Sequence, residues 1–358
     1  MDLGIIGLPL SGKTALWRAL TAAKDSAAHF APGARVETLP ARVLDERLEI
    51  LSRMEGSAKT SYVQVNIHDV TGMITGGGAG AAREISAEVL GKVRAFDLLA
   101  IVLRAFADDS VPHPLGTLDP ARDLAEVESE LVLADLEIVE RRIEKLAAPS
   151  TRPKKEREAD EQELAVQGRV KRALENGQPA RSVELSADDL FRLRSFQFLS
   201  AKPVLAVLNI GEQDIGKPLP EFLGRRAAVA VSARTEAELL ELDEAERQEL
   251  AAGMGIARPA MDTCLRAALA AAGMAQFFTL GPTDSHAWLI RQGEPAVSAA
   301  TRIHKDIGRG FIRAEVVGYG EFVKAGGWKG LKGSALVREE GKDYPVQDGE
   351  IINVRFSA

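Results

Sequence analysis

The 358-residue sequence has a single cysteine, few aromatic residues (5%) and no excess of positive charge. One cysteine excludes an intramolecular disulfide framework and favours a reducing compartment, so we expect a cytoplasmic protein. The sequence lacks any run of about 18 apolar residues and any basic-then-apolar leader, so it predicts no membrane association. The net charge of −7 excludes a surface that is basic throughout, so any contact with nucleic acid must be local.

The sequence does contain a phosphate-loop motif close to its start. Residues 7–14 read G-L-P-L-S-G-K-T and fit G-x-x-x-x-G-K-[ST], with a short apolar run before them and helical apolar spacing after them. This context predicts a nucleoside di- or triphosphate, with the Lys13 amine at the β/γ oxygens and the Thr14 hydroxyl on Mg²⁺. The predicted phosphate-binding residues are Leu10, Ser11, Gly12, Lys13, Thr14 and Ala15.

A D-x-x-G motif follows a strand-like run at residues 62–67. Asp69 is suited to hold Mg²⁺ from outside its first ring of ligands, and the Gly72 N–H is suited to reach the γ-phosphate. A chance turn would give the same pattern, but its place one strand after a phosphate loop favours the functional interpretation. The predicted metal residues are therefore Thr14 and Asp69, and the second switch contains Asp69, Gly72 and Met73.

The base is expected at the ends of two later strands. Residues 203–208 form an apolar run typical of a buried parallel strand and lead into N-I-G-E, and residues 227–231 lead into S-A. GTPase-type domains read guanine with N-K-x-D, but here Ile210 replaces the Lys and the longer Glu212 replaces the Asp. Losing one charged hydrogen bond costs roughly 1.5–3 kcal/mol, so we expect ATP to bind in preference to GTP. The predicted base-binding residues are Asn209, Ile210, Glu212, Ser232 and Ala233.

The apolar pattern predicts three domains. An α/β nucleotide-binding domain covers residues 1–115 and 199–273, and residues 116–198 interrupt it with an antiparallel helical hairpin. A coiled-coil seam is predicted on the first helix, and a second helix is expected at about 154–175. Residues 274–358 change to short strands and glycines, with Trp288 expected in the core and Trp328 at the surface. The predicted seam residues are Leu124, Val127, Leu131, Ala134 and Ile138.

The turn of the predicted hairpin carries a cluster of basic residues. Its members are Arg152, Lys154, Lys155 and Arg157. They are candidates for contact with RNA phosphates, although acidic neighbours dilute them and an ordinary solvated face is the alternative.

With these motifs the chain resembles the YchF-type Obg-like ATPases, a translation-factor-related branch of the P-loop GTPases. The resemblance runs along the chain, through D-P-x-R-D at 119–123, E-L-x-L-A-D-L-E at 130–137, G-F-I-R-A-E-V at 310–316 and G-K-D-Y-x-V-Q-D-G at 341–349. It implies a P-loop NTPase (GTPase-type) domain, an inserted antiparallel helical hairpin and a C-terminal TGS-like β-grasp domain. It also implies ATP hydrolysis with Mg²⁺ and a ribosome or RNA partner, and we expect a monomer.

The departures from that family cluster around the γ-phosphate. Leu10, Ser11 and Ala15 replace an Asn, a small apolar residue and a hydroxyl, and residues 30–37 lack the Thr that completes the Mg²⁺ ligands. Met73 stands where Ras-like enzymes have a water-orienting Gln, as in the family, so slow hydrolysis is expected. Two hypotheses remain: a slow ATPase that acts as a switch at the ribosome, or a nucleotide-binding interaction protein with hydrolysis lost or with GTP/GDP specificity.

Overall fold

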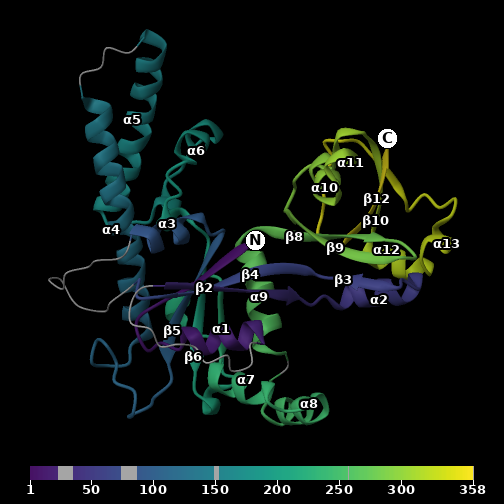
Figure 1. Ribbon diagram of the computed structural model, residues 1–358, viewed down its shortest axis with the longest axis horizontal. Helices are drawn as coiled ribbons and strands as arrows, with labels where there is room; N and C mark the ends of the chain where they lie inside the picture. The colour runs from purple at the N-terminus through teal and green to yellow at the C-terminus, as the bar shows by residue number, and fades with distance from the viewer. Residues whose placement is uncertain (23–34, 74–86, 149–152, 257, 358) are drawn as a thin grey trace. The chain divides into compact units, whose positions relative to one another are not determined.

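A computed structural model describes residues 1–22, 35–73, 87–148, 153–256 and 258–357 (Figure 1). The chain divides into two compact units. Unit 1 consists of Met1–Leu39 and Asn66–Cys264, and unit 2 consists of Pro40–Val65 and Leu265–Ala358. Each unit contains one six-stranded sheet. Among the described residues, every helix is too short or too polar to span a membrane.

The sheet of unit 1 is largely parallel. Its strands are β1 (Asp2–Ile6), β2 (Arg35–Val43), β4 (Val63–Thr71), β5 (Leu98–Ala105), β6 (Val204–Ile210) and β7 (Ala228–Val231), in the order β2-β4-β1-β5-β6-β7. β1 pairs in parallel with β4 and β5, β5 with β6, and β6 with β7. The carboxyl ends of these five strands therefore meet at one edge, which is where ligands bind in open α/β sheets.

Helices bury the strands of this sheet. α3 (Ala87–Ala95) and α4 (Pro120–Ala147) pack apolar side chains against one face, with Val93 and Leu131 in the same cluster as Leu99, Leu103 and Leu208. α1 (Lys13–Thr21) lies beside α7 (Ala233–Leu240), and α8 (Glu244–Gly253) and α9 (Ala260–Ala271) follow along the chain. Burying each such Leu or Val side chain stabilises the fold by roughly 1.5–3 kcal/mol.

α4 and α5 (Lys154–Glu175) form the predicted helical hairpin, but its seam differs from the prediction. Val132 and Val139 of α4 pack against Val166, Val170 and Leu174 of α5. Three predicted seam residues, Leu124, Val127 and Leu131, instead join the core of the sheet. The first half of α4 lies on the sheet, so its apolar stripe is buried there. η1 (Ala180–Ser182), α6 (Ala187–Leu193) and η2 (Leu199–Ala201) lead the chain back to β6.

Asp135 joins the hairpin to the rest of unit 1. Its fully buried carboxylate accepts hydrogen bonds from the backbone N–H groups of Leu199 (3.0 Å) and Ser200 (2.7 Å). It also accepts from the Ser200 hydroxyl (2.8 Å) and from Arg94 on α3 (2.7 Å). Residues 116–198 therefore share one compact unit with the nucleotide-binding part, whereas the predicted boundaries separate the two.

Unit 2 contains a mixed sheet. Its strands are β3 (Lys59–Ser61), β8 (Met274–Leu280), β9 (Asp284–Arg291), β10 (Phe311–Gly318), β11 (Arg338–Glu340) and β12 (Glu350–Phe356), in the order β11-β10-β12-β8-β9-β3. α10 (Ala296–Ile303) packs Ala296 and Ala299 into a core with Phe277, Ile290 and Val316. A mixed sheet with a packed helix agrees with the expected β-grasp class. α11 (Lys305–Arg309), α12 (Tyr319–Ala325) and α13 (Trp328–Leu331) complete the unit.

Residues 40–65 belong to unit 2, whereas the predicted boundaries assign them to the nucleotide-binding domain. β3 pairs in parallel with β9, from Lys59↔Asp284 to Ser61↔His286. α2 (Glu46–Glu55) buries Leu48 and Leu51 completely. Because these partners lie more than two hundred residues further along the chain, local composition gives no sign of them. Trp328, expected at the surface, is half-buried with its ring edge-on to Phe322.

Candidate nucleotide-binding site

The phosphate loop connects β1 to α1 at the carboxyl edge of the unit 1 sheet. Gly12 caps α1 with φ 93°, in the left-handed region. A Cβ atom there would lie 2.0 Å from the Asn209 amide nitrogen at the end of β6. Only glycine fits this close approach, so the loop is held against the strand that carries the predicted base-binding residues.

The Lys13 side chain lies across the loop. Its amine donates hydrogen bonds to the carbonyl oxygens of Gly7 (3.1 Å) and Leu8 (2.7 Å). Burial lowers the pKa of Lys13 to about 8, and the nearby Asp69 carboxylate opposes this shift. An amine in such a place gains from an anion beside it, as the sequence motif predicts.

Thr14 and Asp69 meet at the predicted metal position. The Thr14 hydroxyl donates a hydrogen bond of 2.7 Å to Asp69 Oδ2. Asp69 Oδ1 and the Ser11 hydroxyl are buried and have no hydrogen-bond partner. Burial raises the pKa of Asp69, while the Thr14 hydrogen bond and the Lys13 charge lower it. Buried unpaired oxygens are rare in folded proteins, and the oxygen atoms of Thr14 and Asp69 are of the kind that Mg²⁺ prefers, so these residues would suit that ion.

The start of β2 contributes two further charges. Thr38 hydrogen-bonds His68 Nδ1 (2.7 Å), so its hydroxyl is engaged away from Asp69. Side chains alternate between the two faces of a strand, so Arg35 and Glu37 lie on the face of β2 opposite to Thr38. On the neighbouring β4, Asp69 likewise lies on the face opposite to His68. Arg35 and Glu37 form an ion pair of 2.9 Å. Burial, Thr14 and Lys13 have the largest effects on the Asp69 pKa. The Glu37 charge also raises this pKa, and the Arg35 charge lowers it. Residues 30–34 of the first switch lie outside the described residues.

The structure brings most of the predicted base-binding residues together. The buried Asn209 amide donates to the Ser11 carbonyl (3.0 Å) and accepts from the Ala233 N–H (3.1 Å). Ser232 caps α7 by accepting a hydrogen bond from the Thr235 N–H. Asn209 therefore links the phosphate loop to α7, whereas the Glu212 side chain at the start of η3 (Glu212–Asp214) is exposed.

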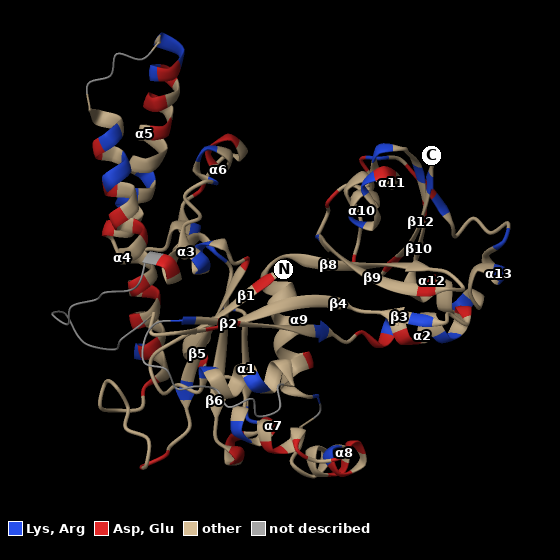
Figure 2. Cartoon of the chain, viewed as in Figure 1, with Lys and Arg blue, Asp and Glu red and all other residues tan. Residues whose placement is uncertain are grey.

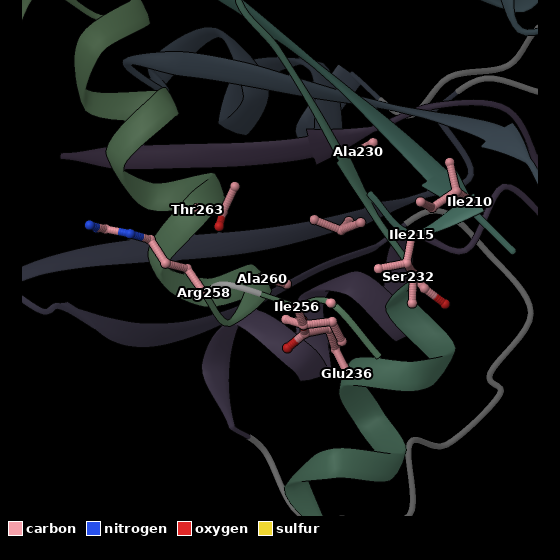
Figure 3. Close-up of a pocket in the computed structure, with 11 residues that line it drawn as sticks. Ile210, Ile215, Ala230, Ser232, Glu236, Ile256, Arg258, Ala260 and Thr263 are labelled. Carbon is pink, nitrogen blue, oxygen red and sulfur yellow. The ribbon is translucent and has the colours of Figure 1, made fainter. Parts of the chain in front are cut away.

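A cavity of about 240 Å³ lies beside the ends of β6 and β7 (Figure 3). Two predicted base-binding residues, Ile210 and Ser232, line it together with the apolar side chains of Ile215 and Ile256. Burial raises the pKa of Glu236, another lining residue, and a hydrogen bond from the Ala260 N–H opposes the shift. The cavity thus combines apolar walls with a few polar groups, as small-molecule sites commonly do.

The remaining predicted residues lie in different surroundings. Met73 is buried in the core of the sheet, so its side chain faces no solvent, and Gly72 has φ 73°. The glycine-rich segment after it, from residue 74, lies outside the described residues, and so does Arg152. Lys154, Lys155 and Arg157 are exposed at the start of α5, far along the chain from the phosphate loop.

Arg104 is a buried residue next to the candidate site that sequence reasoning missed. It is buried at the end of β5, next to Asn209 in the strand register. Its guanidinium donates to the carbonyl oxygens of Phe106 (3.2 Å), Asp108 (3.1 Å) and Val111 (2.8 Å) and so shapes the loop at the ligand edge. An arginine at the end of an apolar strand was the available signal.

The D-P-x-R-D block fixes the chain after this loop. Asp119 caps α4, and Asp123 binds His113 (2.9 Å) and Arg122 (2.8 Å). These contacts explain the D-P-x-R-D pattern by a structural role next to the candidate site.

Together, the parallel sheet, the glycine-capped loop and the Lys13–Thr14–Asp69 arrangement define a P-loop NTPase of the GTPase type. Residues 274–357 match the family model YchF-GTPase_C, described as a protein of unknown function (DUF933). The chain is 33% identical to the ribosome-binding ATPase YchF of Bacillus subtilis, over 100% of this chain and 99% of that protein. It is 31% identical to Obg-like ATPase 1 of Caenorhabditis elegans, over 100% and 92%.

The solved structure of the Schizosaccharomyces pombe YchF GTPase superposes with a TM-score of 0.82 at 26% identity, covering 99% of this chain and 97% of that one. The chain belongs to the YchF family. The resemblance and the fold class predicted from the sequence are therefore confirmed.

Proposed function

We propose that the protein binds ATP with Mg²⁺ and hydrolyses it slowly. The observation that carries the proposal is the Thr14–Asp69 hydrogen bond, with the second Asp69 oxygen buried and unpaired beside the phosphate loop. Relatives that match nearly the whole chain are named ribosome-binding ATPases, which supports nucleotide hydrolysis.

In this proposal each residue acts by position and charge. The loop N–H groups and the Lys13 amine would hold the phosphate oxygens, and Thr14 and Asp69 would hold Mg²⁺, which would supply positive charge to the phosphates when bound. Arg35 and Glu37 lie on the same face of the sheet as Asp69, within the segment 30–37 that lacks the Thr expected from the family. Met73 is buried and carries no proton-accepting group, so water is not activated by this side chain and turnover is slow.

We propose a preference for ATP over GTP because Asn209 is committed to the loop and to α7, and Glu212 is exposed. Calorimetric titration with ATP and GTP in Mg²⁺ tests this preference. The double variant Ile210→Lys with Glu212→Asp restores N-K-x-D and should move affinity towards GTP by about tenfold, the value of one charged hydrogen bond. Tighter GTP binding by the parent protein would overturn the assignment.

The second candidate is a nucleotide-binding interaction protein without hydrolysis. The absence of a Thr in residues 30–37 and the engagement of Thr38 by His68 favour it. Release of phosphate from ATP, measured with and without ribosomes, separates the two. Phosphate release by the parent that Lys13→Ala abolishes supports the ATPase, and binding without release in both conditions supports the alternative.

We further propose that the protein works as a monomer at the ribosome, and therefore in the cytoplasm. The named ribosome binding of its relatives supports this partner. Basic and acidic positions are interspersed along the ribbons of α4 and α5 (Figure 2), so contact through the hairpin would depend on the predicted basic cluster.

A further inference from the structure

Unit 2 contains a groove of about 610 Å³ that none of the predicted site residues line. Its walls include Arg42, Lys59, Tyr62, Gln64, His286 and Trp288. β3 pairs with β9 over three positions, the last being Ser61↔His286. The residues that follow this pair in each segment, 62–64 and 287–289, also line the groove.

An aromatic ladder leads from the core of unit 2 to this groove. The rings of His286 and Trp288 are stacked, with centroids 3.9 Å apart and planes within 12°. Trp288 stacks in turn near the buried Phe277, at 6.4 Å and 17°. Trp288 was expected in the core, but it is half-buried, and its ring stacks with both Phe277 and His286. Its indole N–H donates a hydrogen bond to the Thr279 hydroxyl (2.9 Å).

The outer ring of the ladder is held in place but accessible. His286 is 31% exposed, and its Nδ1 lies 3.3 Å from Asp284. The Asp284 carboxylate also accepts a hydrogen bond from Ser61 (2.9 Å), which fixes β3 beside the ring. A flat ring held in this way loses little conformational entropy when another ring stacks on it.

Two cations flank the ladder. Arg42 and Lys59 are both exposed, and within the described ranges neither makes an ion pair. Arg42 and Tyr62 line the same groove, and burial and Glu49 raise the pKa of Tyr62 while Arg42 lowers it. The exposed Gln64 adds an amide with two donors and an acceptor.

We propose that this groove binds single-stranded RNA, with an unpaired base stacked on the His286–Trp288 ladder and flanking phosphates against Arg42 and Lys59. Single-stranded RNA is recognised by base stacking on aromatic rings and by cations along the backbone, and both features meet here. The inference rests on the proposed ribosome association, because it names the surface and the chemical class of that partner. It also agrees with the net negative charge, which requires any RNA contact to be local.

Binding of a labelled eight-nucleotide single-stranded RNA to the full chain, followed by fluorescence anisotropy across a salt series, tests the proposal. Arg42→Ser with Lys59→Ser should weaken binding at least tenfold and lower the salt slope by about 1.4, since each single-strand phosphate contact adds about 0.7. The control Lys332→Ser with Lys342→Ser removes two exposed cations of the same unit outside the groove and should bind like the parent.

A second pair of variants isolates stacking from charge. His286→Ala should weaken binding at least fivefold, and His286→Phe should restore it, because a base stacks on either ring. Binding of UMP or of duplex RNA as tightly as the single strand would overturn the proposal, and so would parental affinity in the Arg42/Lys59 variant. Sedimentation of the parent with ribosomes is measured separately. If only the groove proposal is wrong, the parent protein still sediments with ribosomes. If the proposed ribosome association is wrong, the parent protein does not sediment with them.

Discussion

At the scale of single residues, Leu10 is strained. It is 52% exposed and has φ 60°, a left-handed conformation that costs an L-residue about 1–2 kcal/mol. Asn tolerates this region, so Leu10→Asn should raise the free energy of unfolding by about 1 kcal/mol. Thermal and denaturant unfolding measure the change. The control is Leu190→Asn on α6, where the leucine is 57% exposed and helical, and which should give no gain.

Lys13 couples both stability and nucleotide binding to pH. Its folded pKa of about 8 lies below the usual lysine value of 10.5, so between these pH values the unfolded chain binds more protons. Stability should therefore rise with pH across this window, and less so in Lys13→Ala. Bound triphosphate keeps the amine charged, so ATP binding by the parent should take up protons above pH 8 and weaken as pH rises further.

Calorimetry in buffers of different ionisation enthalpy measures this proton uptake. Lys13→Ala should lose triphosphate binding while remaining folded, because the amine bonds only to two loop carbonyl oxygens among the described residues and Asp69 keeps its hydrogen bond from Thr14. Lys92→Ala removes an exposed lysine of α3 and serves as the control. Equal ATP affinity in the parent and in Lys13→Ala would contradict the assigned role of the loop.

At the scale of elements, Asp135 connects α4, α3 and η2. Its carboxylate accepts four hydrogen bonds in a fully buried position, one of them from Arg94. Asp135→Ala should lower the free energy of unfolding by about 3–5 kcal/mol, because Arg94 and two backbone N–H groups lose their partner. Urea unfolding tests this. Glu137→Ala, an exposed acid of the same helix, should change stability by less than about 1 kcal/mol.

The hairpin is a separate element with its own prediction. Changing Arg152, Lys154, Lys155 and Arg157 to Ser should weaken ribosome sedimentation and flatten its salt dependence, with ATP affinity unchanged. The separation of effects follows from length, since the 22 residues of α5 span roughly 33 Å. Neutralising Glu156, Glu158 and Glu161 to Gln should act in the opposite direction. Identical pelleting of all variants at every salt would remove the hairpin from the RNA-contacting surfaces.

Elements with a local signal were predictable from the sequence. The apolar run at 203–208 became β6, the phosphate loop preceded α1 as expected, and the second hairpin helix was predicted at about 154–175. What the sequence could not reveal depends on distant partners. The stripe of Leu124, Val127 and Leu131 fits a coiled coil as well as a sheet face, and the choice depends on what covers it. The second role of Asn209 likewise depends on Ser11, 198 residues away.

At the scale of the whole molecule, the two units cannot be separated by one cut. The chain passes between them near residues 39, 65 and 264. A chain ending at residue 273, the predicted boundary, should aggregate on mild heating, because Leu48 and Leu51 lose the sheet that buries them. Replacing residues 40–65 with a two-residue turn in the same truncated chain should restore solubility and ATP binding. Light scattering and nucleotide titration measure both.

The pairing of β3 with β9 also sets an order of events during synthesis. Lys59 meets Asp284, so 225 residues must be added after β3 leaves the exit tunnel before its partner follows. At roughly 5–20 residues per second, this interval is roughly 10–45 s. During that time β3 is an open strand edge and the apolar face of α2 has no cover, while most of unit 1 already has its sequence. The segment of unit 2 that is made first is thus among the last to reach its native burial, and we expect it to be open to chaperones until β9 has been made.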